Sequence, residues 1–175
     1  MSTAMQDDLQ RGDQVDLSIE QWAAHWPELD VSALNVFGRV HRIFQMYQAQ
    51  ISRVFSDHGI NTASFAVLAA LCRTGAPYRL SVGALAEQTL VSTGGMTMRL
   101  DRLEQAGLIT RERDHDDRRV VYAQLTTTGL GHARRVAEAH FGNESRLLHL
   151  LGHSEREQLA QLLRTLEKSI ETAEG

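Results

Sequence analysis

The segment from residue 61 to residue 125 constrains the fold of this chain most, because three short helices follow one another there at close spacing. Asn61 or Thr62 caps the first predicted helix, Ser81 caps the second, and Ser92 caps the third. Side chains of this kind accept hydrogen bonds from the first backbone amides of a helix. The break between the second and third helices is only a few residues long, which indicates a helix-turn-helix.

Two strand-like runs come directly after the third helix. Residues 108–113 and 120–125 favour β-structure, and the charged stretch 114–119 separates them, so together they predict a hairpin with a polar loop. The order helix, helix, turn, helix, hairpin is that of a winged helix-turn-helix. The predicted fold class is therefore mainly α with a small β-hairpin (α+β).

Long helices flank this region. In residues 31–60, apolar residues recur at steps of three and four until Gly59 ends the pattern. Residues 126–175 carry two further apolar stripes, neither of which has an obvious partner in the central region. We expect one compact domain in which residues 61–125 form the winged helix-turn-helix and the flanking helices serve dimerisation.

Residues 1–30 form an acidic N-terminal arm with a short extra helix. They hold seven acidic residues and one basic residue, whereas the rest of the chain is mildly basic. Ser18 and Gln21 fit a capping box at the start of the extra helix, and Pro27 ends it. Any anionic partner would meet the body of the protein, not the arm.

Composition excludes several classes of protein. A length of 175 residues with 42% hydrophobic residues suits a single globular domain without a membrane span. The acidic start does not resemble a signal peptide, and Cys72 is the only cysteine, so we expect a cytoplasmic protein. No phosphate loop, nucleophile elbow or carboxylate pair is present, and we expect neither catalysis nor a cofactor.

The third helix has the character of a recognition helix. On a helical wheel Met96, Leu100 and Leu103 lie inward, while the small, hydroxyl and basic residues lie outward or between the two faces. Such residues let a helix approach double-stranded DNA and donate hydrogen bonds to phosphates or base edges. The predicted DNA-binding residues of this helix and its cap are Ser92, Thr93, Gly94, Thr97, Met98 and Arg102. Asp101 and Glu104 would repel phosphates, and we expect them to pair with arginines.

Arg118 and Arg119 in the hairpin loop complete the predicted DNA-binding set. An arginine at the tip of such a wing suits a narrow minor groove, where the potential is most negative. Asp117 is the predicted wing support, because an acidic neighbour can hold a guanidinium in position. The alternative is that the loop is an ordinary solvated charge run.

The sequence closely resembles the MarR family of winged-helix regulators over about residues 34 to 170. The resemblance rests on several motifs: Leu80-Ser81 through Leu85-Ala86, Met96-Thr97, Arg99-Leu100-Asp101-Arg102-Leu103-Glu104, Gly107-Leu108-Ile109, Asp117-x-Arg119, and Leu125-Thr126-x-x-Gly129. It implies a homodimer on a palindromic operator, usually a repressor released by a small anionic or phenolic ligand or by oxidation. It also implies that the first long helix and the last two helices interlock between subunits.

The extra helix looks like that of the PecS and UrtR branch, which is associated with urate-type ligands. The resemblance implies that Trp22 and Arg99 bind the ligand, because they match two of the branch's ligand-holding positions. Ala66 stands where the branch has an Asp, so the urate pattern is broken. From the residues alone, Arg99 is expected to be half-buried and to need an anion. Its alternative role is a salt bridge with Asp101 or another helix, and that of Trp22 is hydrophobic anchoring of the arm.

Three competing functions stay open at this stage. His149 and His153, with Glu157 a further four residues on, suggest a metal sensor, although Gly152 indicates a helix break between the two histidines. Cys72 suggests a redox switch, but its spacing places it on a buried face without a nearby cation, as expected of an inert core thiol. The fold could also serve protein contacts alone.

Overall fold

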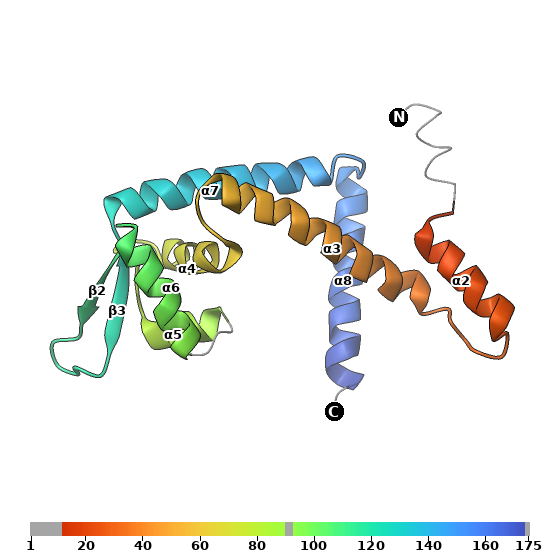
Figure 1. Ribbon diagram of the computed structural model, residues 1–175, viewed down its shortest axis with the longest axis horizontal. Coiled ribbons are helices and arrows are strands. Elements are labelled where there is room, and N and C mark those ends of the chain that lie inside the picture. Colours follow the sequence, from red (N-terminus) through yellow and green to blue (C-terminus); the bar gives the residue numbers. More distant parts are fainter. Residues whose placement is uncertain (1–11, 90–92, 174–175) are drawn as a thin grey trace. The chain divides into compact units, whose positions relative to one another are not determined.

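The chain is mainly helical and carries one small antiparallel sheet, as the computed structural model in Figure 1 shows. The structure describes residues 12–89 and 93–173, so Ser92 lies outside the described residues. Its contacts divide the chain into two compact units, residues 1–50 and 51–175. The boundary falls inside the long helix α3 (Leu34–Asp57), which belongs to both units.

The first unit contains α2 (Gln14–His25), the extra helix, which begins earlier than the sequence suggested. Asp13 is the N-cap, and its carboxylate accepts hydrogen bonds from the backbone amides of Val15 and Asp16 at 2.7 and 3.1 Å. Asp16 returns a bond to the amide of Asp13, which completes a capping box. The prediction that Ser18 caps this helix was wrong, because Ser18 lies inside it.

Contacts between α2 and α3 hold the start of α2 at Asp13. Val15 is buried, and a Cβ built on Gly38 would lie 2.9 Å from its Cγ1, so only glycine allows this close approach. The guanidinium of Arg39 contacts Asp13 at 3.1 Å and Asp16 at 2.7 Å. The hydrogen bonds from Arg39 are the main cause that holds the pKa of Asp16 below its usual value. The two capping residues therefore also fasten the helix.

The second unit is built on three helices, α4 (Thr62–Arg73), α5 (Val82–Gln88) and α6 (Thr93–Gln105). The caps predicted at Asn61 and Ser81 are confirmed, since their side chains accept from the amides of Ser64 and Ala84. The three helices pack around one apolar core with the sheet and helix α7 (Thr127–Leu147). Its fully buried large side chains include Leu68, Leu71, Leu85, Met96, Leu100, Leu103 and Ile109.

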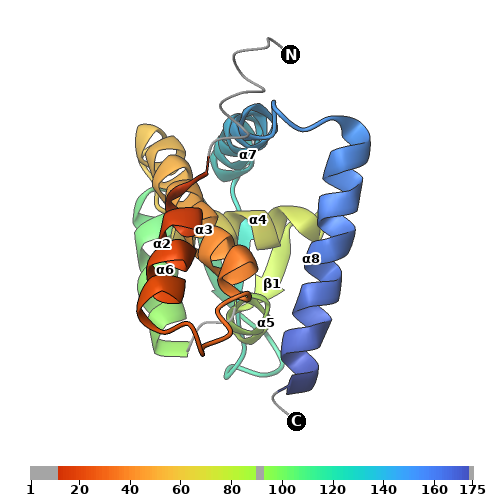
Figure 2. The same cartoon turned by 90° about the vertical axis from the view of Figure 1, so that its right-hand side faces the viewer.

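The hairpin is confirmed and gains a third strand. Strands β2 (Ile109–Arg113) and β3 (Val121–Leu125) pair antiparallel, with Ile109 opposite Leu125. Strand β1 (Arg79–Ser81), labelled in Figure 2, pairs with the other edge of β3 and places Leu80 opposite Ala123. The sequence analysis missed β1, because three residues are too few to show an alternating pattern.

Helices α7 (Thr127–Leu147) and α8 (His153–Ala173) end the described chain. The prediction that both C-terminal stripes lack a partner is correct only for α8, which has no buried residue. In α7, Ala133 and Val136 are buried within the chain. No helix among residues 12–89 and 93–173 has the length and apolar character to span a bilayer.

Candidate nucleic-acid interface

Helix α6 presents a polar face and buries an apolar one, as the sequence predicted. Met96, Leu100 and Leu103 are at most 2% exposed. The opposite face exposes Gly94, Thr97, Met98 and Arg102, and Met98 is 60% exposed. Thr93 begins the helix. Gly94, Thr97, Met98 and Arg102 therefore lie on the solvent-facing side of this helix.

An ion-pair cluster ties α6 to the sheet. Arg111 of β2 binds Asp101 of α6 at 2.7 Å, and its Nε donates to Glu104 of α6 at 2.9 Å. These hydrogen bonds lower the pKa of Glu104 and raise that of Arg111. The expectation that Asp101 and Glu104 pair with an arginine is confirmed. Because Arg111 neutralises them, the acidic residues of α6 offset less of the positive charge of Arg102 and the wing.

The wing loop, residues 114–120, is held by its own acidic side chains. The carboxylate of Asp114 accepts from the backbone amides of Asp116 and Asp117, both at 2.9 Å, and these bonds lower its pKa. Asp117 Oδ1 accepts from the backbone amide of Arg119 at 3.0 Å. The sequence analysis assigned Asp117 to a guanidinium, whereas the bond that the structure shows is to the main chain. The guanidinium groups of Arg118 and Arg119 make no ion pair with a described residue.

A groove joins the wing to the recognition helix. It has a volume of about 490 Å³, and its lining includes Thr97 of α6, Arg119 of the wing and Gly83 of α5. Thr97 and Arg119 were predicted as DNA contacts from separate motifs, and the fold brings them to one concave surface. A hydroxyl and a guanidinium at one surface suit a phosphate backbone and a base edge.

Arg79 is a residue at the base of the wing whose contacts sequence reasoning missed. Its guanidinium lies 4.0 Å from the ring centroid of Tyr122 on the neighbouring strand and 3.7 Å from Glu112. A cation over an aromatic face stabilises both groups and keeps the base of the wing in place. The only available signal was the alternation of Arg79 with Leu80 before the cap at Ser81, which is too short to interpret.

Arg99 and Trp22, the two predicted ligand residues, differ in their burial and in their contacts. Arg99 is half-buried, and its guanidinium makes no ion pair or hydrogen bond with a described residue. The alternative of a bridge to Asp101 is wrong, because Asp101 binds Arg111. Trp22 is 42% exposed and its ring centroid lies 5.1 Å from that of Trp26, which is 50% exposed. Val15 and the ion pairs of Arg39 anchor the arm within its unit.

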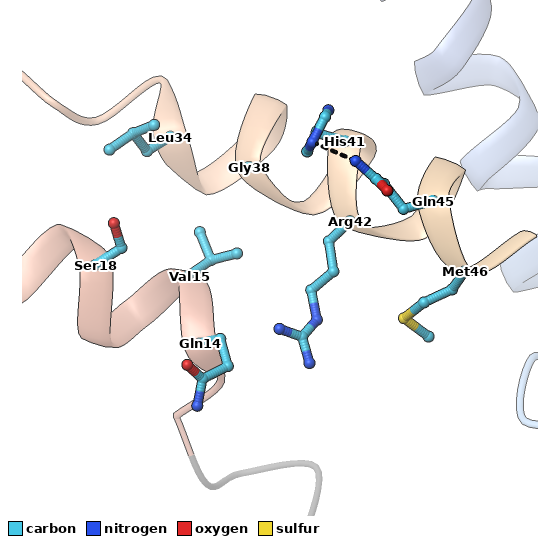
Figure 3. Close-up of a pocket in the computed structure, with 9 residues that line it drawn as sticks. All are labelled: Gln14, Val15, Ser18, Leu34, Gly38, His41, Arg42, Gln45 and Met46. Carbon is cyan, nitrogen blue, oxygen red and sulfur yellow. Dashed lines mark hydrogen bonds between the residues drawn. The ribbon is translucent and has the colours of Figure 1, made fainter.

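A pocket between α2 and α3 was not expected from the sequence. It has a volume of about 430 Å³ and is lined by Gln14, Val15, Ser18, Leu34, Gly38, His41, Arg42, Gln45 and Met46 (Figure 3). Arg42 extends from α3 beside α2, and the Gln45 amide lies 2.9 Å from the His41 ring. Apolar side chains and one guanidinium lie together here, next to the close contact of Val15 with Gly38.

The alternative sensor residues show no assembled site. Among the described residues, no group of three or more His, Cys, Asp or Glu side chains is placed to hold a metal ion. The predicted helix break is confirmed, because α7 ends at Leu147 and α8 begins at His153. Burial raises the pKa of the Cys72 thiol, although Arg73 opposes the shift; the expectation that no cation lies near Cys72 was therefore wrong.

Known proteins match both the sequence and the fold. The family model described as "MarR family" matches residues 58–120. The chain is 36% identical over 152 residues to the HTH-type transcriptional regulator PecS of Dickeya dadantii, covering 87% of this chain and 92% of PecS. It is 32% identical over 132 residues to the HTH-type transcriptional repressor MdtR of Bacillus subtilis, covering 75% of this chain and 83% of MdtR.

A solved structure has a similar fold. BpsR from Bordetella bronchiseptica, whose DNA binding is regulated by 6-hydroxynicotinic acid, superposes with a TM-score of 0.64 at 23% identity. The alignment covers 76% of this chain and 98% of BpsR. Together with the recognition helix, the wing and the groove that joins them, these matches show that the chain belongs to the MarR family of DNA-binding transcriptional regulators.

Proposed function

We propose that this protein is a homodimeric repressor that binds an inverted-repeat operator in double-stranded DNA and is released by a small anionic or aromatic ligand. In this proposal the two copies of α6 enter successive major grooves, about 34 to 36 Å apart, and each wing contacts the adjacent minor groove. Such a regulator acts on chromosomal DNA in the cytoplasm.

The observation that carries the DNA-binding part is the groove that Thr97 and Arg119 share. Arg118 and Arg119 lie on a loop whose main chain is fixed by carboxylates, so both guanidinium groups project from a defined base. Ordered donors lose less conformational freedom on binding than mobile ones. The arginines are therefore suited to phosphate contacts, while Met98 and Thr97 on α6 are suited to base edges.

The homodimer is supported by apolar faces that each unit leaves uncovered. On α8, Leu162 and Leu163 are 60% and 48% exposed. On α3, Ile43 and Phe44 are 62% and 57% exposed. Two long helices with this much exposed apolar surface are typical of an interface, and a second copy of the chain is the partner that the MarR assignment favours.

Release by a ligand is supported by Arg99 and by the character of a relative. A half-buried guanidinium without an anion is costly, so a carboxylate, enolate or phenolate that pairs with Arg99 would bind well. Because Arg99 lies on α6, such a ligand would act on the recognition helix directly. BpsR responds to 6-hydroxynicotinic acid, an anionic aromatic compound, which favours the same chemical class here. Trp22 offers an exposed indole face on which an aromatic ring could stack.

The competing functions predict different behaviour. A metal sensor that uses His149 and His153 would change its DNA affinity when zinc is added or chelated. A redox sensor at Cys72 would change it on oxidation. A protein-interaction module would show no DNA binding that depends on salt.

The first experiment is a titration of the protein against the DNA that flanks its own gene, at several salt concentrations. Urate, 6-hydroxynicotinate and a few other aromatic acids are added in parallel. Tight, salt-sensitive binding that one compound relieves supports the whole proposal, and the Arg99→Ala variant should then lose that relief. Absence of salt-sensitive binding would refute the DNA-binding part.

Two variants distinguish the phosphate contacts of the DNA-binding surface from its base contacts. Arg119→Ala should weaken binding to every sequence and reduce the salt slope by about 1, because it removes a phosphate contact. Met98→Ala should change the preference among bases while leaving affinity for unrelated DNA unchanged. Arg134→Ala is the control, since Arg134 is exposed on α7 and pairs with Glu138. Equal losses from Arg119→Ala and Met98→Ala on all sequences would contradict this division.

A further inference from the structure

Helix α6 carries two carboxylates where neither the helix nor DNA favours them. Asp101 and Glu104 lie three residues apart, so they share one side of the helix. Glu104 is one residue from the end of α6, where negative charge opposes the helix dipole. Near a DNA-binding face, both carboxylates repel phosphates. Arg111 of β2 binds both of them, so their role is to be found in what they hold.

Arg111 is bound through its side chain and its main chain. Its Nε donates to Glu104 Oε2 at 2.9 Å, and its backbone amide donates to Glu104 Oε1 at 3.1 Å. Its Nη2 contacts Asp101 Oδ1 at 2.7 Å. A planar fork of donors bound at several points fixes an orientation that one contact would leave free. We call Arg111, Asp101 and Glu104 the clamp.

The clamp lies where the hairpin leaves the core. Along β2, Ile109 is buried, Arg111 is half-buried, and Glu112 and Arg113 are exposed. Arg111 is therefore the last residue of β2 that is packed against the body of its unit.

A groove separates the wing from α6 beyond this point. Its lining includes Arg111 itself, Thr97 of α6, and Arg119 and Val121 of the hairpin. Val121 pairs with Arg113, so it lies further along the hairpin than Arg111. The clamp thus joins the two predicted DNA-contacting elements at the base of the groove between them.

The wing follows any movement of Arg111. Strands β2 and β3 pair up to Arg113, and the Asp114 amide then donates to the Val120 oxygen at 2.9 Å. From Arg111 to Asp114 the chain spans roughly 10 Å, at about 3.3 Å per residue. A rotation of about 15° at Arg111 would move the start of the loop by about 2–3 Å, whereas hydrogen-bond lengths vary by only about 0.5 Å.

We propose that Arg111 is a positioning residue for DNA binding, which fixes the angle between α6 and the wing through Asp101 and Glu104 so that both elements reach one DNA site together. The inference rests on the proposed function, because it concerns how that DNA site is reached. Two binding elements held at the correct separation bind far more tightly than two that move independently.

The Asp101→Asn/Glu104→Gln double variant separates positioning from charge, because the two effects have opposite signs. Both substitutions keep the size of the side chain and remove a negative charge. Charge alone predicts tighter binding to every DNA sequence. Loss of positioning predicts operator affinity lower by about tenfold or more, with affinity for unrelated DNA unchanged or higher. Unchanged or tighter operator binding would overturn the proposal.

A double-mutant cycle separates positioning from a general loss of stability. With the clamp intact, Arg119→Ala weakens operator binding and lowers the salt slope by about 1. In the Asp101→Asn/Glu104→Gln background the wing is no longer held in place, so Arg119→Ala should change operator affinity by less than about twofold. Met98→Ala on α6 should keep its effect on base preference. A less stable but correctly positioned protein would keep the full effect of Arg119→Ala, and that result would overturn the proposal.

A distance measurement without DNA tests the geometry, so that its failure is distinct from failure of the proposed function. Nitroxide labels are attached to Gln105→Cys at the end of α6 and Arg118→Cys in the wing, both exposed positions, in a Cys72→Ser background. Pulsed electron spin resonance then measures the distance between the labels. An excess of unlabelled protein restricts the measured distances to one protomer.

The intact clamp should give one narrow distance distribution. Asp101→Asn/Glu104→Gln should shift or broaden it by about 2–3 Å. Glu138→Gln is the control, because it removes an exposed partner of Arg134 on α7, and it should leave the distribution unchanged. An unchanged distribution in the clamp variant would overturn the proposal even where DNA binding is confirmed. Should that variant fail to fold, Arg111→Lys keeps the charge without the fork and should lower operator affinity by about threefold or more.

Discussion

Replacement of Gly129 by alanine is the sharpest test of how α7 meets the sheet. A Cβ at Gly129 would lie 1.8 Å from the backbone oxygen of Leu108 and 2.7 Å from its carbonyl carbon. Restoring ordinary contact near 3.4 Å requires a displacement of about 1.6 Å between the start of α7 and the chain before β2. Backbone on both sides forms this contact, so no side chain can rotate away.

The displacement would lower the free energy of unfolding, because it would break hydrogen bonds formed where α7 meets the chain before β2. The Thr126 amide donates to the Leu108 oxygen at 3.1 Å, and Thr126 Oγ1 donates to the Gly107 oxygen at 2.8 Å. Overpacking costs roughly 1–3 kcal/mol, and loss of the two bonds costs about 1 kcal/mol each. Alanine returns about 1 kcal/mol by its helix propensity. The net loss in the free energy of unfolding is therefore about 2–4 kcal/mol.

Thermal unfolding at fixed protein concentration measures the effect, because the Tm of the proposed homodimer would depend on concentration. At about 2–4 °C per kcal/mol for a chain of this size, Gly129→Ala should lower the Tm by roughly 4–16 °C. Gly131→Ala is the matched control: its Cβ would meet only Arg135 Nη1, at 3.8 Å, so the Tm should rise slightly. A Gly129→Ala Tm within 2 °C of the wild-type value would refute the reasoning.

Two further predictions concern titratable groups. Glu104 has a folded-state pKa below its usual value, so its contribution to stability is present above about pH 4.5 and is lost as pH falls through the folded pKa. In acid denaturation, Glu104→Gln should therefore be less stable than wild type near neutral pH and approach it at low pH; a constant difference would contradict this. The raised thiol pKa of Cys72 predicts slow labelling by a thiol reagent in the native protein and rapid labelling on unfolding, and rapid native labelling would restore the redox alternative.

The elements that local chemistry specifies could be predicted from the sequence. Asn61 and Ser81 are good caps at the start of apolar patterns, and the inward face of α6 follows from a period of 3.6 residues. The hairpin follows from two β-branched runs around a charged loop. The family motif Leu125-Thr126-x-x-Gly129 could be recognised in the sequence, but the structural roles of its residues could not. Only the packing shows that Thr126 caps α7 and that Gly129 must lack a side chain.

Features that depend on neighbours distant in sequence needed the tertiary structure. Two capping boxes compete at the start of α2, and packing of Val15 on Gly38 with the ion pairs of Arg39 favours the one at Asp13 over the one at Ser18. β1 is a strand because the edge of β3 supplies its hydrogen bonds.

The candidate sites also combine features that the sequence determined with features that only the tertiary structure decided. The sequence by itself determined which residues of α6 and the wing are exposed and basic, because helical period and turn composition are local properties. The tertiary structure decided which residues meet: Thr97 with Arg119 at one groove, and Arg111 with Asp101 and Glu104 in the clamp. Such meetings depend on how helices and strands pack, and packing is set by the shapes of side chains from the whole unit.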